Sequence, residues 1–141
     1  MTESQLRPAI GALALAGLAI ASYLTYARYS GTQLYCATGG CETVQHSRYA
    51  VIAGIPVGVL GLAAFAAVLG TAIARGSTAA ALGFGLAAAG VVFSAYLLVA
   101  QLFLIHAVCQ WCVASDAVVT LLAISSWARF VLAQRAVPAA A

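Results

Sequence analysis

The sequence contains no lysine and no asparagine, and only nine of its 141 residues are charged, six arginines and three acids. Soluble domains carry a charge on about a quarter of their residues. A soluble domain of this size exposes too much surface for nine charged side chains to cover. Hydrophobic residues make up 65% of the chain, and its mean hydropathy is +1.05. Because long uncharged stretches recur along the chain, the composition predicts a polytopic membrane protein. The net charge of +3 indicates no nucleic-acid partner.

Four apolar stretches are each long enough to predict a membrane-spanning helix. Residues 76–115 are forty consecutive positions without a full charge. This is too long for one crossing, at about 1.5 Å per residue through a hydrocarbon core of about 30 Å, so we expect the chain to turn back at residues 106–109. The prediction is an all-α membrane protein, one domain over residues 1–141 forming a four-transmembrane-helix bundle, with helices at approximately 8–28, 55–75, 79–105 and 109–132.

The arginines predict the orientation of this bundle. With a cytoplasmic N-terminus, four of the six arginines lie on the cytoplasmic side, which obeys the positive-inside rule. These four are Arg7, Arg75, Arg129 and Arg135, and the outer two are Arg28 and Arg48. The same orientation places both termini in the cytoplasm. It places all four cysteines on the extracytoplasmic side of an inner or plasma membrane, where disulfides form and persist.

The N-terminal apolar run also has features of a cleaved signal peptide. Arg7 precedes the run, and Ala19-Ile20-Ala21 matches the small-residue pattern of a cleavage site. The run continues through Tyr26, however, which is further than such a signal needs. We therefore favour a retained first helix.

The four cysteines form two pairs of different spacing. Cys36 and Cys41 are separated by four residues that include two glycines, which allows the bend that a disulfide requires. Cys109 and Cys112 have the C-x-x-C spacing at the start of the fourth expected helix, where backbone amides stabilise a thiolate. Thiolates are the attacking species in disulfide exchange. We therefore expect a relay in which external thiols reduce the loop pair and the loop pair reduces the helix pair.

A lipid-soluble quinone is the expected electron acceptor. The sequence contains no flavin or dinucleotide fingerprint, and the chain is too short for a Rossmann unit beside its helices. The helix pair borders the apolar phase. A dithiol that closes to a disulfide releases the two electrons and two protons that reduction of a quinone requires.

Three other readings of the cysteines and histidines stay open. Two static disulfides in a non-catalytic membrane protein would use the same four residues, although the strained C-x-x-C ring is readily reduced. The four thiolates also match a tetrahedral zinc site by ligand count, although 67 residues separate the two pairs. A haem bound by His46 and His106 is the third reading. We favour the redox relay and expect no metal.

The order of these residues resembles the vitamin K epoxide reductase family. The ordered features are the loop cysteines, then Ser47, then Gly54-Ile55-Pro56, then Cys109-x-x-Cys112. The resemblance covers roughly residues 8–133 and is closest to the stand-alone bacterial branch without a fused thioredoxin-like domain. A second quinone-linked family, the bacterial disulfide-bond protein B type, has its two cysteine pairs in the reverse order.

The resemblance implies a four-helix bundle around a quinone, menaquinone or ubiquinone, with a separate periplasmic thioredoxin-fold thiol oxidase as partner. It implies that Cys36 and Cys41 are the shuttle pair, and that Cys41 links to Cys109 during transfer. Cys112 is then the residue that faces the quinone and forms a charge-transfer or covalent adduct. Ser47 caps a short helix in the extracytoplasmic loop between helices 1 and 2.

The chain departs from the family members that reduce the epoxide. Those members use an asparagine and a tyrosine near the ring, whereas this sequence has no asparagine and has Asp116 where the tyrosine falls. This favours a thiol:quinone oxidoreductase that supports disulfide bond formation, with epoxide reduction as the alternative. Asp116 lies one turn after Cys112, so it either supplies protons near the quinone or bonds a hydroxyl such as Ser94.

Two further residues near the helix pair have two interpretations each. Trp111 is either close to the quinone or an anchor at the membrane interface. His106 either stabilises the Cys109 thiolate or marks the water boundary, and we favour the boundary.

Overall fold

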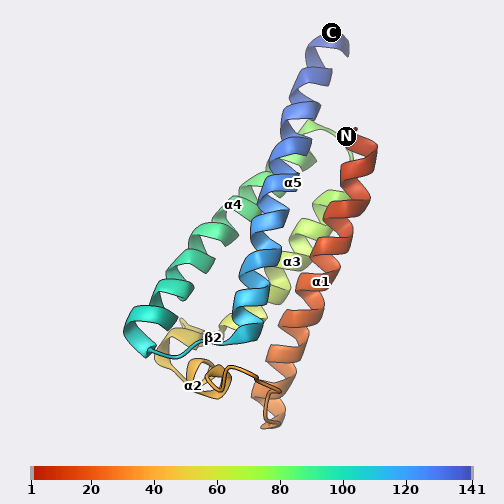
Figure 1. The fold of residues 1–141 in the computed structure, drawn as a ribbon. Coiled ribbons are helices and arrows are strands. Elements are labelled where there is room, and N and C mark those ends of the chain that lie inside the picture. Colours follow the sequence, from red (N-terminus) through yellow and green to blue (C-terminus); the bar gives the residue numbers. More distant parts are fainter. Residues whose placement is uncertain (1, 141) are drawn as a thin grey trace.

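The computed structural model describes residues 2–140, so that Met1 and Ala141 of the expected domain lie outside the described range. Four long helices lie side by side (Figure 1): α1 (Glu3–Ser30), α3 (Val57–Ile73), α4 (Ser77–Val99) and α5 (Gln110–Ala140). Helix α1 packs against α3 and α5, and α4 packs against the same two helices. Both ends of the chain lie at one end of the bundle, and the short helix α2 (Cys41–Gln45) lies at the other.

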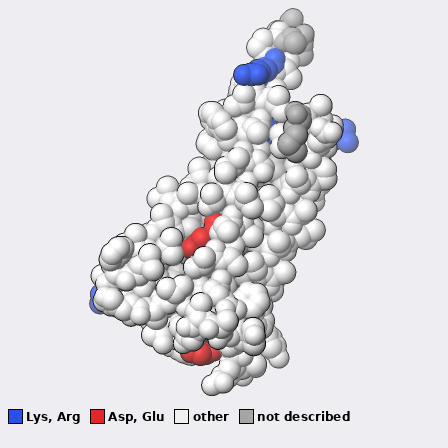
Figure 2. Space-filling view, in the orientation of Figure 1, with Lys and Arg blue, Asp and Glu red and all other residues white. Residues whose placement is uncertain are grey.

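Three of the helical segments are long and apolar enough to cross a membrane, by length and composition: residues 3–30, 77–105 and 110–138. Helix α3 is apolar but shorter, with 17 residues. Almost all of the face shown in Figure 2 is uncharged, and arginine appears near the two ends of the molecule. The expectation of a mainly helical chain with membrane-length apolar helices is confirmed.

The second long helix begins later than the expected residue 55. Strand β1 (Val51–Ile52) pairs antiparallel with β2 (Ile55–Pro56) in a small hairpin that follows the 3₁₀ turn η1 (Arg48–Ala50). Ala53 and Gly54 form its turn with φ values of 52° and 81°, as a two-residue turn with positive φ at both positions requires. Pro56 is therefore the N-cap of α3, one residue before the helix begins.

The outer helices run past their expected ends. Helix α1 begins at Glu3 rather than at about residue 8, because the Gln5 side chain accepts a hydrogen bond from the Thr2 amide at 3.0 Å and closes the first turn. Helix α5 continues to Ala140 rather than ending near residue 132.

Helix α4 continues as a π-helical segment, η2 (Ala100–Ile105), and His106 ends it with a φ of 58°. The turn before α5 thus lies where the sequence predicts it.

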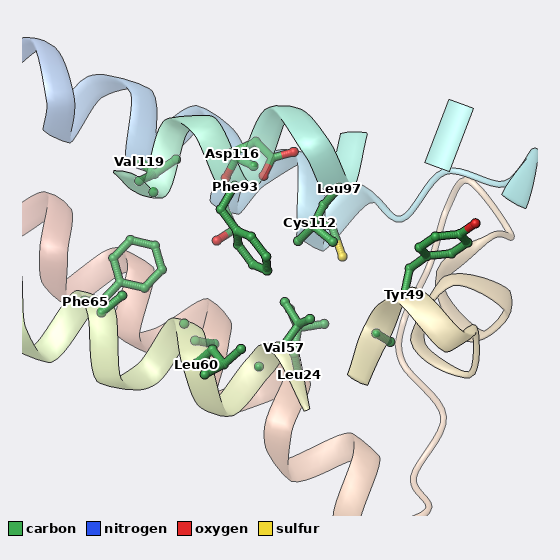
Figure 3. A pocket seen from close by; sticks show the side chains of 18 of the residues that line it. Leu24, Tyr49, Val57, Leu60, Phe65, Phe93, Leu97, Cys112, Asp116 and Val119 are labelled. Atoms are coloured by element: carbon green, nitrogen blue, oxygen red, sulfur yellow. The ribbon is translucent and has the colours of Figure 1, made fainter. Parts of the chain in front are cut away.

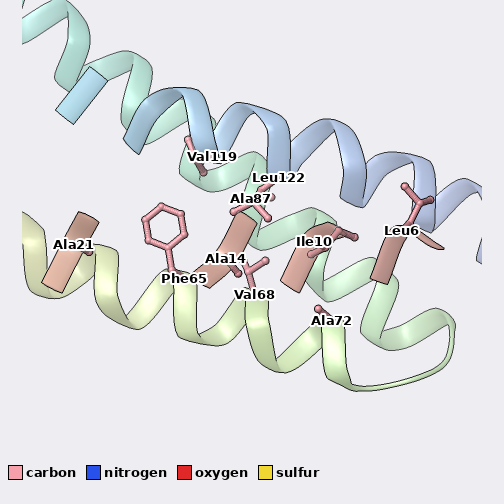
Figure 4. Close-up of a cluster of buried hydrophobic side chains, with 10 residues drawn as sticks. All are labelled: Leu6, Ile10, Ala14, Ala21, Phe65, Val68, Ala72, Ala87, Val119 and Leu122. Carbon is pink, nitrogen blue, oxygen red and sulfur yellow. The ribbon is translucent and has the colours of Figure 1, made fainter. Parts of the chain in front are cut away.

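The main hydrophobic core lies between the four long helices, and all four contribute side chains to it (Figure 4). Ile10 of α1, Phe65 of α3 and Leu122 of α5 are all at least 94% buried in it. The Phe65 ring lies against Gly17, where any side chain would overlap it. Because helices in lipid associate through close packing rather than through water exclusion, this contact holds α1 and α3 together.

Two arginines bind the carbonyl groups at the C-terminal end of α3. Arg129 of α5 is 1% exposed, and it donates to the carbonyls of Thr71 at 2.6 Å and Ala74 at 2.8 Å. Arg7 of α1 donates to the carbonyl of Ala72 at 2.9 Å. The last carbonyls of a helix have no partners within it and carry partial negative charge. These two guanidinium groups therefore supply hydrogen-bond donors to the C-terminal carbonyls of α3, the shortest of the four long helices.

Replacement of Arg129 by alanine should destabilise the bundle. Arg129→Ala leaves the carbonyls of Thr71 and Ala74 and the Glu3 carboxylate, which lies 3.4 Å from the arginine, without their donor. We expect a loss of about 3 kcal/mol in the free energy of unfolding, measured by chemical or thermal unfolding in detergent. The exposed Arg135→Ala is the matched control. Equal stability of the two variants would contradict the role given to Arg129.

Candidate functional site

The loop pair is closed as a disulfide. Cys36 and Cys41 are joined, with their Cα atoms 6.0 Å apart. Cys41 is the first residue of α2 and is fully buried, whereas Cys36 is half-buried. Gly39 between them has a φ of 76°, a value that glycine adopts without strain. The more accessible sulfur of this disulfide is therefore that of Cys36.

The helix pair is a dithiol at the start of α5. Cys109 and Cys112 carry free thiols; Cys109 is fully buried and Cys112 half-buried. The amide of Cys112 donates to the sulfur of Cys109 at 3.4 Å. The Gln101 side chain in the π-helical segment accepts a hydrogen bond from the Cys109 amide at 2.8 Å. Cys109 is thus held from both sides, by the first turn of α5 and by the end of α4.

Hydrogen bonds lower the pKa of Cys109. The side-chain hydrogen bond from Cys112 is the largest contribution, and burial, which raises the pKa, is the second. The amides of Cys112 and Trp111 and the Gln45 side chain lower the pKa further. Together they bring the pKa of Cys109 from 9.0 to about 7. A thiol with this pKa is a good leaving group in disulfide exchange.

The two pairs are brought together by a close approach of two backbone segments. Cys41 and Cys109 lie in one buried cluster. Gly40, which precedes Cys41, lies so close to Val108, which precedes Cys109, that an added Cβ would be 2.5 Å from the Val108 carbonyl oxygen. Thr38 donates to the same carbonyl at 2.8 Å. Glycine at position 40 therefore allows the loop pair to lie against the helix pair.

The residues between the helix cysteines hold the loop on either side of Cys36. The Gln110 side chain accepts a hydrogen bond from the Ala37 amide at 2.8 Å. The Trp111 indole donates to the carbonyl of Tyr35 at 2.7 Å, and its ring packs edge-on against Tyr23 with centroids 5.0 Å apart. The C-x-x-C segment thus also supports the loop that carries Cys36.

Helix α2 is anchored at its C-terminal end. The Ser47 hydroxyl donates to the carbonyl of Val44 at 2.7 Å, and Arg28 of α1 donates to the carbonyl of Gln45. The Glu42 side chain accepts a hydrogen bond from the Leu34 amide at 3.0 Å. These contacts fix α2, and with it Cys41, on the end of α1.

An apolar cavity of about 370 Å³ lies between the helices beside Cys112. Figure 3 shows Cys112 and Asp116 on α5 and Phe93 and Leu97 on α4 facing Val57 and Leu60 of α3 across it. Its polar lining includes Gln45, Ser47, Ser94 and Asp116. Binding sites for small molecules have this size and this combination of apolar walls with a few polar groups. A flat aromatic head group with carbonyl oxygens fits such a lining.

A sequence profile of the vitamin K epoxide reductase family matches residues 8–127, which include both cysteine pairs, Ser47 and Asp116. The chain belongs to the vitamin K epoxide reductase family. A search of curated proteins found no match. Family members are membrane oxidoreductases whose chemistry is linked to quinones. The expected family is confirmed.

Of the other predicted site residues, two line the cavity and two lie outside it. Asp116 lines the cavity, its Oδ2 atom is buried, and nothing within residues 2–140 forms a hydrogen bond to that atom. Ser47 lines the cavity too. Trp111 lies outside the set of lining residues, packed under the loop. His106 is exposed at the end of the π-helical segment.

The described residues hold no cluster that could bind a metal. Between residues 2 and 140, no group of three or more His, Cys, Asp or Glu side chains is close enough to coordinate an ion. A zinc site built from the four cysteines would need all of them as thiolates, whereas Cys36 and Cys41 are joined to each other.

Sequence reasoning missed three glutamines around the cysteines. Gln101 supports Cys109, Gln110 supports the loop, and Gln45 lies beside the Cys112 sulfur. The only available signal was for Gln101, which is a polar residue near the end of a long apolar run. Polar residues in such positions are costly unless they have a partner.

The approach of Gly40 to Val108 can be tested by cross-linking. In a chain with Cys36→Ala and Cys112→Ala, only Cys41 and Cys109 can form a disulfide on mild oxidation. Gly40→Ala forces the backbones apart at a cost of about 1–3 kcal/mol, so we expect cross-linking to slow about tenfold, measured by mass spectrometry. Gly85→Ala is the control, because a Cβ at Gly85 meets nothing within 4 Å among the described residues. Unchanged cross-linking in Gly40→Ala would contradict this role.

Proposed function

We propose that this chain is a thiol:quinone oxidoreductase that oxidises a thioredoxin-fold partner outside the cytoplasm and thereby supports disulfide bond formation. The observation that carries the proposal is the position of the Cys109–Cys112 dithiol. It lies between a closed disulfide on the loop and an apolar cavity that Cys112 lines. A pair in this position can accept electrons from one side and release them on the other.

The proposal includes a membrane topology. Helix α3 is the fourth crossing, both termini are cytoplasmic, and α2 with the four cysteines is extracytoplasmic. The position of both termini at the end of the bundle away from α2 supports this arrangement (Figure 1). Arg129 and Arg7, which bind the end of α3, support it too, because arginines concentrate on the cytoplasmic side. The site is then in the compartment where disulfides persist.

Electrons pass from the partner to the helix pair by four thiol–disulfide exchanges. A partner thiolate attacks Cys36 and releases the Cys41 thiolate, which attacks Cys109 of an oxidised helix pair and releases Cys112. The partner's second thiol then closes the partner's disulfide and releases Cys36. Finally Cys36 attacks Cys41, re-forms the loop disulfide and releases Cys109. The partner has lost two electrons, and the helix pair has gained them.

The end of this sequence has the redox state seen here, with the loop disulfide closed and the helix pair reduced. The lowered pKa of Cys109 favours the last exchange, because Cys109 is its leaving group and thiols of lower pKa leave faster. The exchange therefore runs toward the dithiol beside the cavity.

The cavity residues define how a quinone would be held. Phe93, Leu97 and Leu60 provide apolar walls, and Ser94 and Asp116 provide polar groups for its oxygens. A bound quinone takes up two electrons and two protons, which are the products of closing a dithiol to a disulfide. Cys112 is the cysteine that lines the cavity, so it is the residue of the pair that contacts the ring.

A turnover assay with a reduced thioredoxin-fold protein and a soluble quinone tests the proposal. We expect quinone reduction to depend on all four cysteines. Cys112→Ala should abolish turnover, because it removes the cysteine at the cavity. The remaining Cys109 thiolate can attack Cys41 of the loop disulfide and release Cys36, so we expect a Cys41–Cys109 disulfide to accumulate. Loss of the hydrogen bond from Cys112 raises the pKa of Cys109 and makes it a poorer leaving group from this linkage. Non-reducing peptide mapping detects this linkage.

Three outcomes of this assay would count against the proposal. Full quinone reduction by Cys36→Ala or by Cys112→Ala would exclude the relay. Turnover of a quinone epoxide without turnover of the quinone would replace the proposed reaction with epoxide reduction. If the Cys→Ala substitutions lowered stability but left turnover unchanged, the four cysteines would have a structural role only.

We propose that Asp116 supplies a proton to the quinone site. Its buried Oδ2 atom lines the cavity on the helix face that carries Cys112. Asp116→Asn keeps the shape and polarity but removes the exchangeable carboxyl proton. We expect quinone reduction to slow about a hundredfold, as for loss of a general acid, while thiol exchange at Cys36 keeps its rate. An Asp116→Asn chain with full quinone reduction would refute this role.

A further inference from the structure

Gln45 is the last residue of α2, and its side chain contacts a sulfur of the helix pair. Its Nε2 atom lies 3.5 Å from the Sγ atom of Cys112, within the range of an N–H···S hydrogen bond. Gln45 also lines the cavity. The amide therefore touches both a reacting atom and the space where an acceptor would bind.

The surrounding contacts hold Gln45 in this place. Cys41 and Gln45 are four residues apart in α2, so they lie on the same face of the helix. The backbone carbonyl of Gln45 accepts a hydrogen bond from Arg28, and Ser47 binds the preceding carbonyl at 2.7 Å. The turn of helix that carries the shuttle cysteine thus also carries the donor to Cys112.

Within residues 2–140, Gln45 is the only side chain that donates a hydrogen bond to the Cys112 sulfur. The titratable side chains that line the cavity are Tyr49, Cys112 and Asp116, and Cys109 is the neighbour in the pair. Asp116 would repel a Cys112 thiolate once it has given its proton to the quinone site. The helices α1, α3 and α4 contribute mostly apolar residues to the lining. In such surroundings one well-placed N–H group has a large effect on a negative charge.

We propose that Gln45 is a catalytic residue. It donates a hydrogen bond to Cys112 and stabilises the Cys112 thiolate that forms during oxidation of the helix pair to a disulfide. The role rests on the proposed thiol:quinone function. Closing the Cys109–Cys112 disulfide breaks two S–H bonds, forms one S–S bond and passes two electrons and two protons to the quinone. Gln45 acts after the Cys112 proton has left and before the S–S bond forms.

Thiol alkylation tests this contact without a quinone. In a Cys109→Ala chain with the loop disulfide closed, Cys112 is the free thiol, and its reaction with iodoacetamide is followed from about pH 6 to about pH 10. Gln45→Met has similar length and no donor. We expect it to slow alkylation about tenfold at neutral pH and to reach the parent rate at alkaline pH. Gln134→Met is the control. It replaces an exposed glutamine of α5 and should leave the pH dependence of alkylation unchanged.

Gln45→Glu is the second variant, and its negative charge should slow alkylation at neutral pH at least as much as Gln45→Met does. Equal rates in Gln45→Met and the parent at neutral pH would overturn the proposal. A decrease that is the same at every pH would also overturn it, because that result indicates changed access. Thiol:quinone turnover of the unmodified chain is measured in parallel. Its absence refutes the proposed function, whereas the alkylation profile decides the Gln45–Cys112 contact independently.

Discussion

The close approach of Gly40 to the backbone of Val108 is the contact on which the rest of the site depends. It places the residue before Cys41 against the residue before Cys109, so the buried cysteine of each pair lies in the same cluster. Cys36 and Cys112, the other two, are half-buried, and Cys112 lines the cavity. The order from outside to inside is therefore Cys36, Cys41, Cys109 and Cys112, the order that a relay requires.

The two ends of the bundle serve different purposes. At the end with the termini, Leu6, Ile10 and Ala72 are buried in the core, and the hydrogen bonds of Arg129 join α5 to α3. At the other end, the same helices separate enough to leave a cavity of about 370 Å³. The π-helical segment at the end of α4 lies at this second end, and π-helical turns are frequent at functional sites. Its Gln101 connects this irregular turn to Cys109.

Much of this could be predicted from the sequence, because composition and residue order carry the information. Few charges and long apolar runs predict a helical membrane protein, and the order of the two cysteine pairs with Ser47 predicts the family. The hairpin before α3 could not be predicted, because Val51 and Ile55 match an apolar helix equally well and its turn needs Ala53 at positive φ. The supporting contacts of Gln110 could not be predicted either, since they join residues more than seventy positions apart.

The central claim is that the helix pair, and not the loop pair, delivers electrons to the quinone. The most direct measurement is rapid-quench thiol mapping after one equivalent of quinone is added, without oxygen, to the fully reduced chain. We expect Cys109–Cys112 to be the first disulfide that forms and Cys36–Cys41 to close only afterwards. Closure of Cys36–Cys41 while Cys109 and Cys112 have not yet reacted would contradict it.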